Sequence, residues 1–478
     1  MNLGIGSMVK GKALTNRILC KVVTEDLNMR GFQYKLGLNE DIQPLVTRGR
    51  CKAGLHFAEM KDICNFLDYG TKLAIVSIPD EEPVYVDNGK FRAHKLIIER
   101  VMDLGSVDTW RYMHKHGADI AAGGNYAVKW AARNGHLEIV KYLHEHGADI
   151  TAGDNEAVRL AAGNGHLEIV QYLHKHGANI TAKNNHAVIW AAENGYLEVV
   201  RYLHENGADI PDGNNKAVRW AAFYGHLDVV KYLHENGADI VAYSNEAVRW
   251  AAENGYLDVV KYLHEHGADI TAYNNEAVRL AAENGHLRVV QYLHKHGANI
   301  TAQNDYAVRH AARNGHLEIV KYLHEHGADI TVQNNCAVKW AAENGRLDVV
   351  QYLHENGADI TARDNEAVRR AARNGHLEIV KYLHLQMRKE NIMKLSNVKV
   401  TENTNVWIPL LKPFAIRMFS NALFLFCAVL FGCLTSGYWK FIAVPFVILV
   451  ISDLIFYFMG VARRKREKEA LLRTGKKN

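Results

Sequence analysis

The sequence predicts a mainly α-helical protein, a solenoid of thirty-residue units between a small N-terminal α+β domain and a C-terminal transmembrane helical hairpin. Three observations predict this architecture. A corner built on Asn-Gly and Leu recurs every thirty residues, strand-like segments precede the repeats, and two long apolar runs follow them. The predicted parts are 1–100, the α+β domain; 101–384, about ten repeats; 385–413, a linker; 414–460, two transmembrane helices; and 461–478, a basic cytosolic tail.

The first hundred residues carry both kinds of local signal. The segments GFQYKLG from Gly31, KLAIVSIP from Lys72 and PVYVDN from Pro83 are typical of strands. The segment FAEMKDICNFLDYG from Phe57 has a helical pattern. We therefore expect a small α+β module here.

The repeats keep a strict period. Corners of the type NGHLEIV start at Asn134, Asn164, Asn194, Tyr224, Asn254, Asn284, Asn314, Asn344 and Asn374, and a degenerate copy starts at Leu104. No insertion interrupts the spacing. Such self-similarity indicates a solenoid in which each unit buries its apolar face on its neighbours.

The unit 151–180 shows the local signals of one repeat. Asn155 is a good N-cap for a short helix over residues 156–162, and Asn164-Gly165 ends that helix. A second helix is predicted over residues 167–175, closed by Gly177.

These residues carry a resemblance to a known family. Leu160-Ala161-Ala162, the segment 164–170 and the turn 177–180 are similar to the ankyrin repeat, and the pattern covers about 280 residues. The resemblance implies pairs of antiparallel helices, with protein contacts on the hairpin fingers and first helices. The unit is about three residues shorter than usual, so stubbier fingers are expected. Residues 53–79 are similar to the leader of ankyrin arrays in amoeba-infecting giant viruses.

The C-terminal segment predicts membrane insertion. Residues 419–434 and 441–460 are apolar runs, and Arg417 can snorkel at the first while Asp453 lies inside the second. The cluster Arg463, Arg464, Lys465 and Arg466 follows, and by the positive-inside rule both termini and the repeats stay cytosolic. The basic tail is expected to contact anionic lipid headgroups. For Asp453, a polar contact within the hairpin or an oligomer is favoured over a conducting path.

Three columns of equivalent positions suggest chemistry. The histidine column runs from His114 to His384, but its members are too far apart to share a metal ion, so we expect structural histidines and no metal or cofactor. The basic column includes Arg219 and Arg249, and Glu156, Glu246, Glu276 and Glu366 stand three residues before four of its members and are expected to compensate the charge; no nucleic acid is expected. A Trp column is expected to pack in the core, and His310 interrupts it without an explanation.

The variable positions are the candidate protein-binding residues. They are Tyr126, Lys183, His186, Lys216, Tyr243, Tyr273, Gln303, Tyr306, Gln333 and Arg363. Tyr and Arg are frequent among residues that dominate interface energies.

No nucleophile elbow, phosphate-binding loop or zinc spacing occurs, so the prediction is a non-enzymatic, membrane-tethered scaffold for protein-protein interaction. The viral resemblance points to host or viral partners at a host cell membrane. The alternatives are an adaptor for ubiquitin ligase targeting, or a membrane-shaping or channel protein that uses the C-terminal hairpin.

Overall fold

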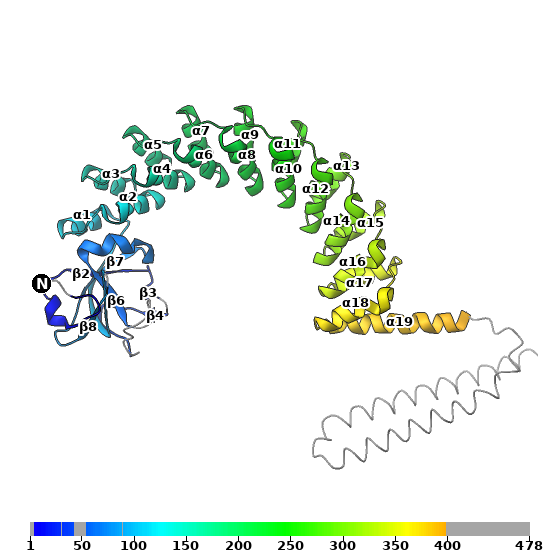
Figure 1. Cartoon of the computed structure of the whole chain (residues 1–478), viewed down its shortest axis with the longest axis horizontal. Coiled ribbons are helices and arrows are strands. Elements are labelled where there is room, and N and C mark those ends of the chain that lie inside the picture. The colour runs from blue at the N-terminus through cyan, green and yellow to red at the C-terminus, as the bar shows by residue number, and fades with distance from the viewer. Residues whose placement is uncertain (1–3, 30, 43–53, 88, 398–478) are drawn as a thin grey trace, which may run out of the picture. The chain divides into compact units, whose positions relative to one another are not determined.

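The computed structural model describes residues 4–29, 31–42, 54–87 and 89–397 (Figure 1). Residues up to Met387 form one compact unit that contains the N-terminal domain and the repeat array. The expected hairpin, the basic tail, Arg417 and Asp453 lie outside the described residues. Among the helices that are described, none is long and apolar enough to cross a membrane.

The N-terminal domain is built around an antiparallel sheet of eight strands in the order β1-β8-β9-β6-β2-β7-β10-β5, with a separate β3-β4 hairpin. The strands are β1 (Met8–Lys10), β2 (Leu19–Val23), β3 (Asn28–Met29), β4 (Phe32–Gln33), β5 (Gly37–Glu40), β6 (Leu55–Glu59), β7 (Lys72–Ser77), β8 (Pro83–Asp87), β9 (Lys90–Ala93) and β10 (Lys95–Asp103). Two 3₁₀ helices, η1 (Gly11–Leu14) and η2 (Met60–Tyr69), complete it.

Two predictions for this domain need correction. The helical prediction from Phe57 begins too early, because Phe57 pairs with Phe91 in the sheet and the helix starts at Met60 as a 3₁₀ helix. The strand predicted from Gly31 is only two residues long, and β5 begins at Gly37. The strands at Lys72 and Pro83 are confirmed.

The array consists of inner and outer helices in alternation. The inner helices are α2 (Ala122–Arg133), α4 (Ala152–Gly163), α6 (Ala182–Glu193), α8 (Asp212–Tyr224), α10 (Ala242–Glu253), α12 (Ala272–Glu283), α14 (Ala302–Asn314), α16 (Val332–Glu343) and α18 (Ala362–Arg373). The outer helices are α1 (Val107–Lys115), α3 (Leu137–Glu145), α5 (Leu167–Lys175), α7 (Leu197–Glu205), α9 (Leu227–Glu235), α11 (Leu257–Glu265), α13 (Leu287–Lys295), α15 (Leu317–Glu325), α17 (Leu347–Glu355) and α19 (Leu377–Asn397). The prediction for residues 167–175 is confirmed to the residue.

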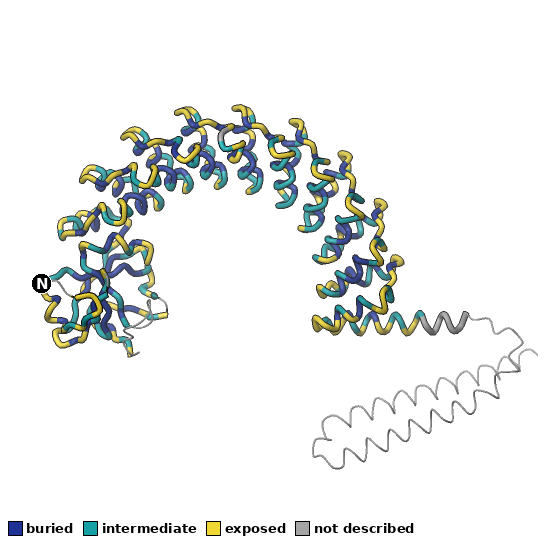
Figure 2. Tube along the Cα trace, in the orientation of Figure 1, coloured by how far each residue is buried: buried dark blue, intermediate teal, exposed yellow. Residues whose placement is uncertain are grey.

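The array curves because its two helix rows differ in side-chain size. Ala157, Ala161 and Ala162 are buried on α4, and these small residues let adjacent inner helices pack closely. Adjacent outer helices, on which larger residues such as Val170 and Leu173 are buried, touch at few points. The inner helices therefore line the concave side of the arc, and Figure 2 shows exposed residues concentrated along its outer edge.

The conserved corner of each repeat depends on a glycine. Gly165 has φ +79°, and a Cβ there would lie 2.5 Å from the ring of Tyr196 in the next repeat. Glycine is therefore required both by the backbone conformation and by the close approach of the neighbouring ring.

The N-terminal domain occupies the place of a missing inner helix. The degenerate first unit contributes the outer helix α1 only, and η2 packs against α2. Cys64 and Leu67 of η2 share one continuous hydrophobic core with Trp110 and Trp130 of the first repeats. A solenoid needs such an end cap, because its terminal unit otherwise exposes apolar surface.

Candidate protein-binding face of the repeat array

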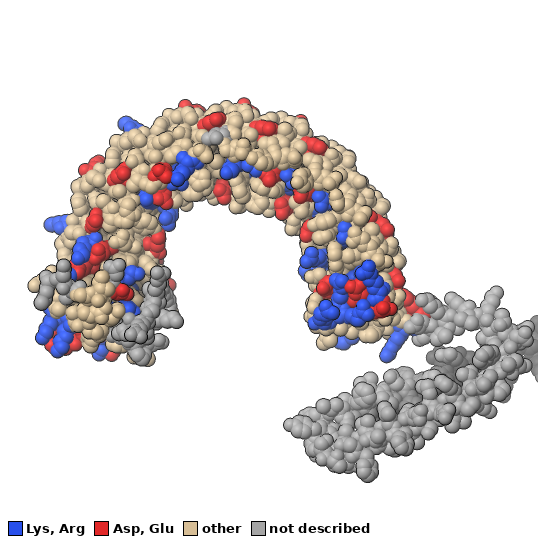
Figure 3. All heavy atoms as spheres, viewed as in Figure 1, with Lys and Arg blue, Asp and Glu red and all other residues tan. Residues whose placement is uncertain are grey.

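The candidate site is the inner face, which we define as the exposed side chains of the inner helices and of the three-residue turns that open them. In Figure 3, acidic and basic side chains are interspersed along the inner edge of the arc. Lys and Arg gather around α18 at the end of the array. The inner face is thus polar and mixed in charge, with no stripe of one sign.

A left-handed turn replaces the hairpin finger in each unit. Gly153, Asp154 and Asn155 all have φ between 56° and 67°, and the Asn155 N–H donates to the Thr151 carbonyl at 2.8 Å. The expectation of a stubbier finger agrees with this turn. L-residues lose about 1–2 kcal/mol each in this conformation, which Gly and Asn tolerate best.

The prediction that Asn155 is an N-cap is wrong. Its Oδ1 accepts a hydrogen bond from the backbone N–H of Asn179, twenty-four residues later, at 2.8 Å. The bond recurs from Asp149 to Asn125, Asp209 to Asn185, Asp239 to Asn215, Asp269 to Asn245, Asn299 to Asn275, Asp329 to Asp305 and Asp359 to Asn335. The asparagine column joins one turn to the next repeat.

The basic column is also a link between repeats. Arg249 donates to the carbonyls of Tyr243 and Ser244 in its own turn, both at 3.1 Å, and pairs with Glu276 of the next unit. Equivalent pairs join Lys129 to Glu156, Arg219 to Glu246 and Lys339 to Glu366. The predicted pairing with a glutamate three residues earlier is therefore wrong, because stacking places the next unit's glutamate opposite each cation.

The uncharged Ile189 interrupts the basic column, and the charge at the facing position of the next repeat explains this. The position twenty-seven residues after it is Lys216, whereas glutamate stands at that position after four of the eight cations of the column. A cation at 189 would face the like charge of Lys216. The buried, uncharged Ile189 avoids this repulsion.

The predicted binding residues fall into two groups. Lys183, Lys216, Tyr243, Tyr273, Gln303, Gln333 and Arg363 are exposed on the inner face. Tyr243 and Tyr273 are 54% and 64% exposed, and the guanidinium groups of Arg219 and Arg249 lie 4.3 and 4.9 Å from their ring centres. These tyrosines are held in place yet accessible.

The other three residues are partly engaged within the chain. Tyr126 donates its hydroxyl hydrogen bond to Asp68 of the N-terminal domain. His186 packs against Trp190, with the ring centres 4.4 Å apart and the rings tilted by 48°. Tyr306 donates to Glu283 Oε2 at 2.7 Å, and burial beside that carboxylate raises the pKa of Tyr306 to about 12.

His310 completes a cluster with Tyr306 and Glu283. Its ring stacks on Tyr306 at 3.7 Å between centres, and its Nδ1 lies 3.2 Å from Glu283 Oε1. Burial lowers the pKa of His310 and outweighs the opposing effect of Glu283. The break in the Trp column therefore provides a partner for a half-buried carboxylate.

The Trp column is less buried than predicted. Trp130 is buried beside the N-terminal domain, but Trp190, Trp220, Trp250 and Trp340 are only partly buried on the inner face. Phe223 and Tyr224 are not among the predicted binding residues, although they stand where other repeats carry mainly charged residues and Asn. Their departure from the repeat pattern could have identified them as candidate binding residues.

The histidine column forms bonds between outer helices. His144 Nδ1 lies 2.9 Å from the hydroxyl of Tyr172 in the next repeat. His146 instead bonds the carbonyl of Tyr142 in its own helix at 2.7 Å. Over the described ranges, no group of three or more His, Cys, Asp or Glu is arranged to hold a metal ion.

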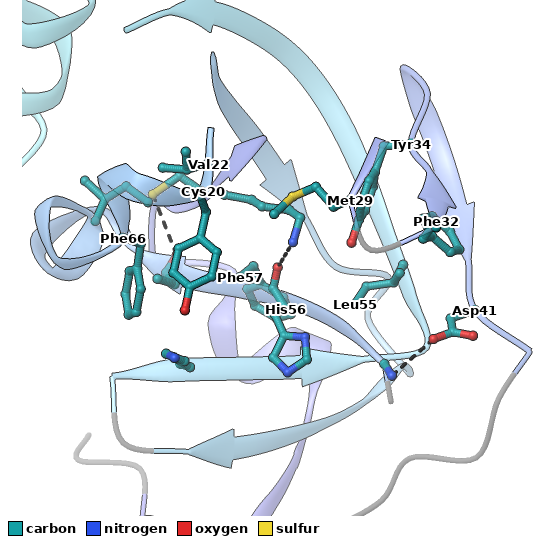
Figure 4. A pocket seen from close by; sticks show the side chains of 17 residues that line it. Cys20, Val22, Met29, Phe32, Tyr34, Asp41, Leu55, His56, Phe57 and Phe66 are labelled. Atoms are coloured by element: carbon teal, nitrogen blue, oxygen red, sulfur yellow. Dashed lines mark hydrogen bonds between the residues drawn. The ribbon is translucent and has the colours of Figure 1, made fainter. Parts of the chain in front are cut away.

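The N-terminal domain holds a cavity of about 340 Å³, shown in Figure 4. The Lys21 ammonium group donates to the His56 carbonyl at 2.8 Å and lies 4.9 Å from the ring centre of Tyr34. Cys20 also lines the cavity, and burial raises the pKa of its thiol. Burial likewise raises the pKa of the neighbouring Cys64 to about 12. Both thiols stay protonated at neutral pH, so neither is an activated nucleophile.

Comparison with known proteins settles the family. The profile of ankyrin repeats in three copies matches residues 151–215, 211–274, 278–364 and 310–393, and a second ankyrin profile matches residues 93–144. The chain belongs to the ankyrin-repeat family. Its left-handed turns are thus a short form of the ankyrin finger.

Similar ankyrin chains occur in a giant virus. An uncharacterized protein of Acanthamoeba polyphaga mimivirus is 35% identical over 135 residues, which are 26% of this chain and 95% of that protein. Two proteins of the same virus named as ankyrin repeat proteins are 38% and 36% identical, over 39% and 22% of their own lengths. The chain thus spans well under half of these last two relatives. The similarity of residues 53–79 to a viral leader stays a prediction.

Proposed function

We propose that this ankyrin-repeat protein is a non-enzymatic scaffold that holds partner proteins on its inner face and is tethered to a membrane by residues 414–460. The observation that carries the binding role is the contrast between invariant and variable positions. Links between repeats use the histidine column, which is invariant, and the asparagine column, which is replaced once by Asp305, while variable side chains such as Tyr243 and Tyr273 are exposed.

The membrane role is supported by sequence. The run 441–460 has about the length that spans a bilayer, and the run 419–434 is slightly short but is lengthened by flanking residues down to Phe414. The cluster at 463–466 favours a cytosolic C-terminus. This orientation leaves the array on the cytosolic side, where host proteins are accessible. The viral relatives suggest host or viral partners at a host cell membrane.

Affinity capture from infected amoebae tests both halves of the proposal. The full chain is compared with a chain lacking residues 412–478, which we expect to leave the membrane fraction. It is also compared with the double variant Tyr243→Gly/Tyr273→Gly, which we expect to stay on membranes and lose partners. Glycine occupies the equivalent positions 153 and 213, so the turn is retained.

Two results would overturn the proposal. If the truncated chain remained with membranes, the tether would lie elsewhere. If the double variant captured the same set of proteins as the parent chain, and that set matched an unrelated solenoid, the inner face would not be a recognition surface.

A further inference from the structure

An aromatic cluster interrupts the polar inner face in the middle of the array. Trp220 and Trp250 have ring centres 5.3 Å apart, and Phe223 lies 5.5 Å from each of them. Tyr224 stacks on Trp220 and is 41% exposed. We call Trp220, Phe223, Tyr224 and Trp250 the aromatic cluster. Partly exposed aromatic rings of this kind are frequent at the centres of protein interfaces.

Glutamates occupy the position of Phe223 in four other repeats, namely Glu193, Glu253, Glu283 and Glu343. Two of them have a side-chain partner twenty-seven positions later in the chain. The Nδ1 atom of His310 lies 3.2 Å from Oε1 of Glu283, and Arg370 forms an ion pair with Glu343. The next repeat is therefore the place from which this chain supplies partners to these carboxylates.

The other two glutamates have no such partner. The residue twenty-seven positions after Glu193 is Trp220, whose indole makes no hydrogen bond to that carboxylate in the described structure, and after Glu253 it is Leu280, which has no polar side-chain group. Among residues 89–397, no ion pair or side-chain hydrogen bond reaches either carboxylate. Both side chains are half-buried, so water compensates them only in part.

The electrostatic environment of Glu253 also favours the binding of a cation. Burial raises the pKa of Glu253, and the nearby Glu276 and Glu283 raise it further. Arg249 opposes this effect, but it pairs with Glu276, so the carboxylate of Glu253 remains the one that a cation from a partner would bind. Glu253 stands three residues after Trp250 on the same inner helix, so it borders the aromatic cluster. Glu193 stands on the other side, one repeat before Phe223.

We propose that this part of the inner face binds an extended segment of another protein that carries an Arg or Lys on each side of an apolar stretch. The apolar stretch lies on the aromatic cluster, and the two cations pair with Glu193 and Glu253. The inference rests on the proposed scaffold function and specifies the chemistry of the partner. Arg suits this place best, because its guanidinium both binds a carboxylate and stacks on aromatic rings.

The distance between Glu193 and Glu253 limits the spacing of the two basic residues in the bound segment. Glu193 and Glu253 are two repeats apart, which corresponds to roughly 16–20 Å at the usual spacing of packed helices. An extended chain advances about 3.3 Å per residue, so the two basic residues should be separated by about five to six positions. Closer spacing would leave one carboxylate unpaired.

A peptide of this design tests the proposal. The probe is fluorescein-labelled Gly-Arg-Ser-Leu-Phe-Leu-Ser-Arg-Gly, titrated with the full chain in nonionic detergent and followed by fluorescence anisotropy. Control peptides replace both arginines with glutamate, or the apolar stretch with serines. We expect the parent chain to bind the probe about tenfold or more tightly than either control, with affinity falling as salt is added.

The variants use residues that the array already accepts. Phe223→Glu/Tyr224→Asn installs the pair present at 193–194 and 253–254, so the fold is expected to persist. Glu253→Gln removes one carboxylate, and Glu343→Gln is the matched control on a carboxylate that Arg370 already neutralises. We expect the first two variants to weaken binding about tenfold and the control to leave it unchanged.

Each outcome bears on the proposal separately from the scaffold function. Equal affinity for all three peptides, or equal loss in Glu253→Gln and Glu343→Gln, would overturn it while capture of partners through Tyr243 and Tyr273 could still hold. A peptide of residues 461–478 that bound more tightly than the probe would also overturn it, because the occupant would then be the chain's own basic tail.

Discussion

The hydroxyl of Tyr232 lies 2.8 Å from Nδ1 of His204, a histidine that precedes it by twenty-eight residues. The same link recurs in nine successive pairs, from His114 with Tyr142 to His354 with Tyr382. Each pair joins the outer helices of neighbouring repeats, whose apolar contact is sparse. The histidine column therefore joins neighbouring units through hydrogen bonds.

Removing one hydroxyl should weaken the array measurably. Tyr232→Phe keeps the ring and deletes one His–Tyr hydrogen bond, so we expect the free energy of unfolding to fall by about 0.5–1.5 kcal/mol. Urea denaturation followed by circular dichroism measures it. Tyr112→Phe is the control, because Tyr112 belongs to the first unit and no earlier repeat supplies a histidine. An equal loss at Tyr112 would contradict the assigned role.

The basic column predicts a coupled pair of substitutions. Ile189→Arg alone should destabilise the chain, because the new cation would face Lys216. Adding Lys216→Glu recreates the pair seen between Arg219 and Glu246. We expect a favourable coupling of about 1 kcal/mol in a double-mutant cycle measured by urea denaturation. Additive effects of the two substitutions would show that stacking does not bring these positions together.

The left-handed turns predict a stabilising glycine. Gln333 has φ 53°, and Gln333→Gly should raise the free energy of unfolding by about 1 kcal/mol because glycine adopts this conformation without strain. The matched control is Gln351→Gly in the helix α17, which should lower it by about 1 kcal/mol. Destabilisation by both substitutions would rule out the left-handed turn at 333.

Stability should depend on pH through half-buried histidines. Burial lowers the pKa of His136, His286 and His294, and the same holds for His310. The unfolded chain, with histidine pKa values near 6.5, then binds more protons than the folded chain below that pH. We expect the free energy of unfolding to be constant above about pH 7 and to fall between pH 6.5 and the lowered folded pKa values. Equal urea midpoints at pH 7.5 and pH 5.5 would contradict this.

Much of the architecture could be read from local patterns. The bounds of the outer helix at residues 167–175, the glycine at 165 and the thirty-residue period all follow from signals within one repeat. The partner of each polar side chain could not be read this way. Asn155 is a residue type typical of a helix cap, yet its backbone is left-handed, with φ 62°, and its side chain accepts a hydrogen bond from Asn179 of the next unit.

The inner face gives a second example of what local sequence patterns predict and what they do not. The sequence identified the exposed tyrosines at 243 and 273 from their variability, and the structure leaves them accessible. It did not identify Glu253 or Phe223, because their significance lies in what stands opposite them one repeat away. His310 had no explanation until stacking placed it beside Glu283.

The sequence by itself determined the repeat, its helices and its family, since these depend on hydrogen bonds and side-chain spacings within a few residues along the chain. Only the tertiary structure decided which residues meet across repeats, at separations of twenty-four, twenty-seven and twenty-eight positions. Those separations are set by how far one unit advances and rotates on the next. That geometry arises from close packing of alanine-rich inner helices, and it decides which inner-face charges remain for a partner.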